Sequence, residues 1–123
     1  MINDNDTTFN FNSYGEDMVL VPRFSRYAST DRVALEFWYE ETIDEDDPEA
    51  TFMAPFAKVT VNMPDVHLNE GEVLIKDYAE NEALVQALID EGWLIQTGRE
   101  VASGFVFPMV ARFAGPLLEA SQA

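Results

Sequence analysis

The segment Glu40–Glu49 most constrains the fold, because seven of its ten residues are acidic. Like charges at this density resist burial, so we expect the segment on the surface, as an exposed loop or as the tip of a loose hairpin. Apolar and polar residues alternate in the flanking segments Arg32–Thr42 and Phe52–Met63, which is the period of a half-buried strand. The pattern predicts two antiparallel strands joined by the acidic connection.

A helix is predicted over residues 79–91, where apolar side chains recur three or four positions apart. Asp77 stands three residues before Glu80, which is the spacing of a capping box. Gly92 is expected to take the left-handed conformation that ends a helix, with Trp93 packing back on the helix in a Schellman motif. The helix therefore has a predicted start and a predicted end.

Shorter apolar segments supply further strands before and after this helix. Together they predict an α+β fold, a mainly antiparallel sheet of about five to six strands with the helix packed on one face. Residues 16–116 are expected to form a single domain, preceded by a flexible polar arm over residues 1–15 and followed by a short tail over residues 117–123. The alternation of Phe9 and Phe11 leaves a short edge strand open as an alternative for the arm.

Charge is the outlier of the composition: 23 acidic residues stand against seven basic ones, for a net charge of −16. A chain this negative is repelled by nucleic acids and anionic membranes, and attracted to the basic surfaces with which proteins hold DNA or RNA. The alternative is that the acidic residues only keep the chain soluble. Since the chain lacks cysteine and its N-terminal residues are neither basic nor apolar, it is predicted to be cytoplasmic.

The residue types that perform most enzyme chemistry are scarce. His67 is the one histidine, and no nucleophile motif lies near it. The acidic segment lacks the central glycine of a calcium-binding EF-hand loop, and the isolated Gly98 and Gly104 do not form a phosphate-binding loop. We therefore predict no enzyme activity, no metal site and no cofactor, with weak divalent-ion binding and a carboxylate pair for glycoside hydrolysis left open.

A resemblance is carried by Lys76–Glu82, the apolar helix, Gly92, and the segment from Ser103-Gly104-Phe105 to Pro108. These residues resemble a family of small uncharacterised proteins encoded by bacterial mobile genetic elements and gut-bacterial genomes, over roughly residues 57–113 of this chain. The resemblance implies an accessory protein of a mobile element. It implies no activity and assigns no role to any residue.

The leading hypothesis is a non-enzymatic acidic protein that mimics nucleic acid and occupies the basic groove of a DNA- or RNA-handling defence enzyme, as anti-CRISPR or anti-restriction inhibitors do. A strand rises about 3.3 Å per residue and a DNA strand about 3.4 Å per base, so acids two apart on a strand lie about two phosphate steps apart. Trp38 is expected to be an exposed anchor beside these charges. The predicted contact residues are Glu36, Trp38, Glu40, Glu41, Asp44, Glu45, Asp46, Asp47 and Glu49.

The alternative hypothesis is a small-ligand-binding or enzymatic accessory module whose pocket lies between the helix and the sheet, with carboxylates from Asp77, Glu80 or Glu82. The same residues also suit the positive end of the helix dipole, which is an ordinary structural role. A structural or regulatory partner within a mobile-element complex is a third hypothesis, and the sequence does not separate it from the first.

Overall fold

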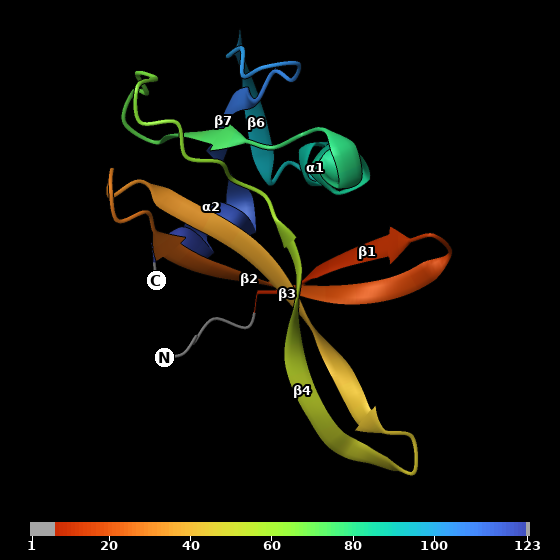
Figure 1. The fold of residues 1–123 in the computed structure, drawn as a ribbon. Coiled ribbons are helices and arrows are strands. Elements are labelled where there is room, and N and C mark those ends of the chain that lie inside the picture. The colour runs from red at the N-terminus through yellow and green to blue at the C-terminus, as the bar shows by residue number, and fades with distance from the viewer. Residues whose placement is uncertain (1–6, 123) are drawn as a thin grey trace.

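The computed structural model describes residues 7–122 and confirms an α+β fold (Figure 1). Within these residues, seven strands form two antiparallel sheets, accompanied by two α-helices and a short 3-10 helix. The strands are β1 Phe9–Ser13, β2 Glu16–Arg26, β3 Val33–Asp44, β4 Asp47–Lys58, β5 Glu72–Ile75, β6 Leu94–Glu100 and β7 Met109–Phe113. The helices are η1 Ala79–Asn81, α1 Glu82–Asp90 and α2 Gly115–Ser121.

The strands form two sheets where one was expected, with the orders β1-β2-β3-β4 and β5-β7-β6. The two are nevertheless joined, because the chain just after β4 pairs with both. The Val59 amide donates to the Leu35 carbonyl in the first sheet (3.0 Å), and the Val59 carbonyl accepts from the Lys76 amide at the end of β5 (2.7 Å). Thr60 adds an isolated antiparallel bridge to Ile75. These few residues serve as a short strand shared by both sheets.

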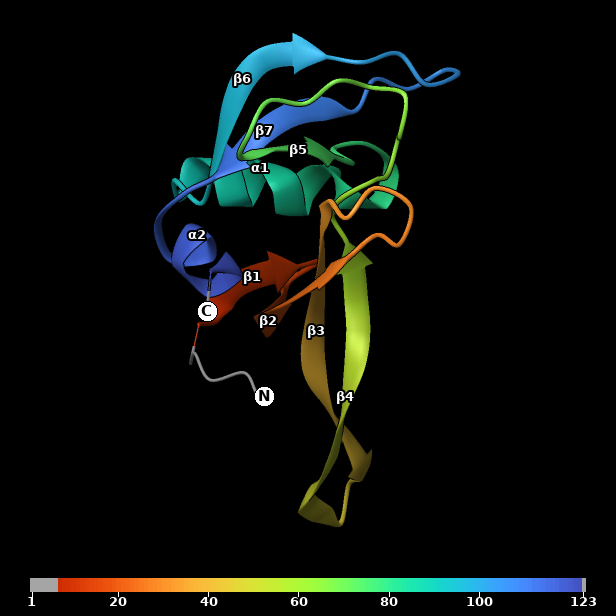
Figure 2. The same ribbon diagram turned by 90° about the vertical axis from the view of Figure 1, so that its left-hand side faces the viewer.

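The core lies where the sheets and helices meet, and Figure 2 shows α1 running beneath the three-stranded sheet. One cluster of buried side chains includes residues from both sheets and both α-helices, among them Phe9, Phe37, Leu88, Phe113 and Leu117. The ring of Phe9 meets that of Trp93 edge-on, with centroids 4.9 Å apart. Since burial of each large apolar side chain is worth about 1.5–3 kcal/mol, this shared cluster holds the layers together.

Both chain ends are more ordered than the polar arm and the short tail expected from the sequence. Phe9–Ser13 forms β1, paired with β2, and buries Phe9, while residues 1–6 lie outside the described residues. The expected tail folds into α2, in which Pro116 occupies the first turn and Leu117 is buried. In each segment the burial of one or two apolar side chains, Phe9 in β1 and Leu117 with Ala120 in α2, orders the chain end.

The predicted end of the helix is confirmed. Gly92 has a φ of 77°, in the left-handed region. The Trp93 amide donates to the Leu88 carbonyl (2.8 Å) and the Gly92 amide to the Ile89 carbonyl (3.0 Å). These are the two hydrogen bonds of a Schellman motif.

The predicted capping box is wrong. No side chain caps η1 or α1, and the residue preceding η1 is Tyr78. The Glu80 carboxylate is instead held by Lys76, whose Nζ lies 2.6 Å from Oε2. Ala79 has a φ of 56°, so the chain turns sharply here and Asp77 does not reach the capping position.

Glu72 fastens the loop before β5 to the three-stranded sheet. Its Oε1 accepts a hydrogen bond from the Asn69 amide (2.8 Å), and its carboxylate lies 3.8 Å from Arg99 and 3.6 Å from Arg112. The two guanidinium groups also donate to backbone carbonyls of the loop, Arg99 to His67 and Arg112 to Glu70. The Asn69 amide, assisted by both arginines, holds the pKa of Glu72 below its ordinary value.

This lowered pKa predicts a pH dependence of stability. The contribution of Glu72 is present above its unfolded pKa of about 4.3 and is lost as the pH falls through its lower folded pKa. The difference in free energy of unfolding between the wild type and Glu72→Gln should therefore be largest near neutral pH and shrink as the pH falls below about 4. Urea unfolding at pH 7, 4 and 3 measures this difference in the free energy of unfolding. Glu91→Gln is the control for the loss of one exposed charge. A difference that stays constant with pH would contradict this role of the carboxylate.

The Schellman motif yields a second prediction. A Cβ on Gly92 meets no atom within 4 Å, so Gly92→Ala tests the backbone conformation alone. The substitution should lower the free energy of unfolding by about 1–2 kcal/mol, the penalty of a left-handed conformation for a residue with a Cβ. Glu91→Ala, at the preceding right-handed position, is the matched control and should change stability by less than about 0.5 kcal/mol in the same urea titration. Equal effects of the two substitutions would count against the motif.

Candidate protein-interaction surface

Strands β3 and β4 extend beyond the rest of their sheet as a two-stranded ribbon. The ladder between β2 and β3 ends at the pair Val21–Trp38, whereas β3 and β4 stay paired to Asp44–Asp47. Figure 2 shows the ribbon projecting away from the body of the molecule. We call residues 39–54 the acidic ribbon, since they include seven carboxylates and no basic residue.

The tip of the acidic ribbon is a tight turn and not a loose loop. Only Glu45 and Asp46 separate the paired residues Asp44 and Asp47. The Asp44 carboxylate accepts from the Asp46 amide (2.9 Å), and the Asp47 carboxylate accepts from the Glu49 amide (3.2 Å). Asp44 and Asp47 thus shape the tip, and the carboxylates of the other three acids project from it.

The acidic residues lie on both faces of the ribbon. Glu40 pairs with Met53 and Glu41 with Phe52, and since side chains alternate along a strand, Glu40 and Glu41 point to opposite faces. Two apolar side chains that the sequence analysis did not single out are exposed among them, Ile43 at 64% and Phe52 at 48%. The ribbon therefore combines charge with apolar contact area on its surface.

Trp38 and Glu36 lie at the base of the ribbon and are less available than expected. Both are half-buried, and the Trp38 indole Nε1 donates to Glu36 Oε1 (2.8 Å). The Arg23 guanidinium covers the Trp38 ring, with Cζ 4.4 Å from its centroid. Arg23 is directly opposite Glu36 on β2, so Trp38 is covered by the cross-strand side chain and Glu36 is hydrogen-bonded to Trp38. The expectation of Trp38 as a freely exposed anchor is wrong for this reason.

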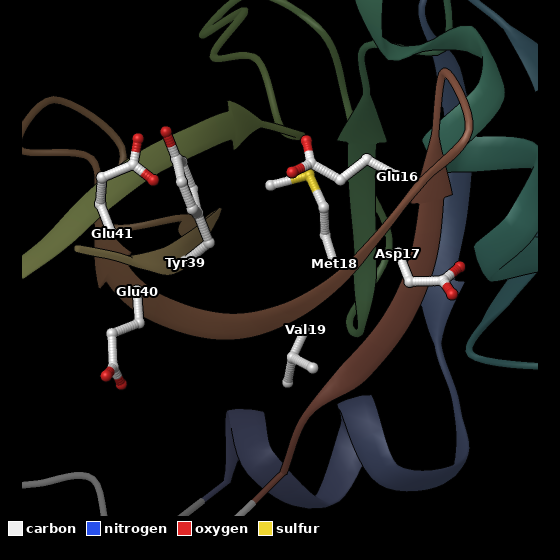
Figure 3. Close-up of a pocket in the computed structure, with 7 residues that line it drawn as sticks. All are labelled: Glu16, Asp17, Met18, Val19, Tyr39, Glu40 and Glu41. Carbon is white, nitrogen blue, oxygen red and sulfur yellow. The ribbon is translucent and has the colours of Figure 1, made fainter. Parts of the chain in front are cut away.

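A pocket lies where β2 and β3 separate, and we call it the fork (Figure 3). It measures about 430 Å³ and is lined by Glu16, Asp17, Met18 and Val19 of β2 and by Tyr39, Glu40 and Glu41 of β3. Glu40 and Glu41 were predicted contact residues, but their neighbours on β2 were not. The end of the β2–β3 ladder, which brings these residues together, leaves no signal in the sequence of either strand.

The structure does not favour the alternative site at the helix start. Glu80 is paired with Lys76, and this hydrogen bond holds the pKa of Glu80 below its ordinary value. Glu82 is exposed in the first turn of α1, and His67 is exposed with its ring beside Asn69 Oδ1 (3.2 Å). Glu80 and His67 thus have the partners of ordinary surface residues, and Glu82 lies where a carboxylate suits the positive end of the helix dipole.

Residues 7–122 contain no group of three or more His, Cys, Asp or Glu side chains placed to hold a metal ion. Within the same range, no helix is long and apolar enough to cross a membrane. Comparisons with family models, with curated proteins and with solved structures found no match to this chain. The resemblance to mobile-element proteins accordingly stays a prediction.

The turn at the tip can be tested with a pair of substitutions. Asp44→Asn keeps an oxygen acceptor for the Asp46 amide, whereas Asp44→Ala removes it. Loss of a hydrogen bond worth about 1 kcal/mol should speed hydrogen exchange of the Asp46 amide about fivefold in the alanine variant. Little change is expected in the asparagine variant. Equal exchange rates in the two variants would mean that the hydrogen bond to the Asp44 side-chain oxygen does not hold the turn.

Proposed function

We propose that this protein uses its acidic ribbon to bind and block a basic surface with which another protein holds DNA or RNA. The observation that supports the proposal best is the charge of the ribbon: seven carboxylates and no base on a projecting two-stranded extension. Among residues 7–122, none of these carboxylates takes part in an ion pair. Asp44 and Asp47 accept backbone amides at the tip, and the other five are available to lysine and arginine side chains of a partner. The mechanism is occlusion and requires no chemical step.

The shape of the ribbon suits a groove. A two-stranded ribbon carries side chains on both faces and can meet both walls of a cleft at once. Ile43 and Phe52 add apolar contacts between the charges, and such anchors usually supply more binding energy than exposed ion pairs. The resemblance over residues 57–113 directs the search to defence enzymes that bind DNA or RNA, the targets of anti-CRISPR and anti-restriction inhibitors.

Charge complementarity of this kind predicts fast association that weakens with salt. Electrostatic attraction between exposed groups is screened beyond about 10 Å at 0.1 M ionic strength. Proteins captured from bacterial lysate at low salt should therefore elute in a salt step. The supporting result is that the purified chain blocks nucleic-acid binding by an eluted protein in a gel-shift assay, since retention alone shows only charge attraction. Eluted proteins that still bind nucleic acid in a saturating excess of the chain would contradict the proposal.

Two variants with the same net charge separate the ribbon from bulk charge. The ribbon variant combines Glu40→Gln, Glu45→Gln, Asp46→Asn and Glu49→Gln, and it should weaken binding to the captured partner about tenfold or more. The control variant combines Glu82→Gln, Glu91→Gln, Glu100→Gln and Glu119→Gln, four exposed acids outside the ribbon. It should weaken binding less than about threefold. If both variants lose the same amount of binding, the partner responds to the net charge of the protein and not to the ribbon.

A further inference from the structure

The fork presents two open strand edges that face each other. β2 continues from Val21 back to Glu16, and β3 continues from Trp38 to Asp44, but their ladder ends at the pair Val21–Trp38. Beyond this pair, no strand within residues 7–122 pairs with the edges of β2 and β3 that face each other. Unpaired strand edges are templates for another strand, and proteins commonly protect them with lysine, proline or a covering segment. The edges of the fork carry carboxylates instead.

The side chains of the fork favour a cationic occupant on both of its faces. Figure 3 shows Glu16, Met18, Tyr39 and Glu41 pointing to one side of the two strands and Glu40 to the other. Carboxylates therefore stand on both faces, so lysine or arginine at successive positions of an inserted strand would each meet an acid. On the first face, Tyr39 and Met18 are partly buried against the core, and the Tyr39 ring meets the Phe56 ring edge-on with centroids 6.1 Å apart. Only the exposed parts of Tyr39 and Met18 can therefore contact a cation and its aliphatic stem.

Other occupants are disfavoured by charge. A second copy of this chain would bring the same four carboxylates of Glu16, Asp17, Glu40 and Glu41 into the fork, and each copy carries a net charge of −16. Nucleic acid and anionic lipid are repelled in the same way. An extended segment of a basic protein is attracted by the carboxylates and can satisfy the open backbone edges.

We propose that the fork between β2 and β3 binds an extended segment rich in lysine and arginine from the partner protein, which adds to the open edges as a strand. This inference rests on the proposed function, because it identifies the segment of the basic partner that the fork binds. The acidic ribbon then enters the groove of the partner while the fork holds a neighbouring basic segment. The site is about 430 Å³, and pairing with the backbone of the partner distinguishes it from the side-chain contacts of the ribbon tip.

The test uses the full ¹⁵N-labelled chain and two peptides. The first is an eight-residue peptide of six lysines and two valines, which places lysine on both faces of the inserted strand. The second is identical except for N-methylation of its two central residues, which keeps every charge but removes backbone donors on both edges. The first peptide should shift the amide signals of Asp17, Val19 and residues 39–43 and slow their exchange, and the methylated peptide should bind at least about tenfold more weakly. Equal affinity for both peptides, or shifts confined to the ribbon tip, would overturn the proposal.

Matched variants distinguish failure of the fork from failure of the proposed function. The fork variant combines Glu16→Gln, Glu40→Gln and Glu41→Gln, and the tip variant combines Glu45→Gln, Asp46→Asn and Glu49→Gln. The fork variant should weaken binding of the unmethylated peptide about tenfold, and the tip variant less than about threefold. If the basic partner is lost by the tip variant and fully kept by the fork variant, the fork proposal fails while the proposed function stands. If neither variant weakens partner binding, both fail.

Discussion

The two sheets depend on a short run of hydrogen bonds around residues 58–61. The buried Thr60 hydroxyl accepts from the Leu35 amide of the first sheet at 3.0 Å. The Asn81 side chain donates to the Lys58 carbonyl at 2.7 Å and ties the helix start to the same run. A buried polar group left without its partner costs about 1–3 kcal/mol. A substitution in this run therefore destabilises both sheets.

Some features that arise between neighbours in the chain could be predicted from the sequence, although the local capping box predicted at Asp77 is wrong, because Ala79 turns the chain there. The β3–β4 pairing across the acidic segment and the helix end at Gly92 both follow from local patterns. Features that depend on distant residues could not. Alternation placed Trp38 on an outer face, but it carries no information about Arg23, the cross-strand side chain that covers the ring. The fork was missed for the same reason, because its walls come from two separate segments.

Basic and acidic residues are distributed unevenly over the structure, and this distribution determines the local potential at the ribbon more than the net charge does. All seven basic residues have a partner within the body: Arg23 and Lys58 lie over aromatic rings, Arg26 and Arg32 donate to backbone carbonyls, and Lys76, Arg99 and Arg112 lie in ion pairs. The basic residues thus stabilise loops and sheet faces of the body, and the acidic ribbon keeps its full negative charge. The resulting potential is concentrated at the end of a projecting element, which can orient a basic partner before contact.

The order of the strands has a consequence during synthesis of the chain. The β1–β4 meander is complete once residue 58 has left the ribosome, but α1, β7 and α2, which share its apolar core, follow only over residues 82–121. In that interval Phe37 and Leu20 lack their final neighbours, and uncovered apolar faces of this kind cause nascent chains to aggregate. The ribbon has by then emerged with all seven carboxylates, so two unfinished chains that approach within about 10 Å of each other repel. The charge proposed to attract a partner would thus also protect the unfinished protein from its own copies.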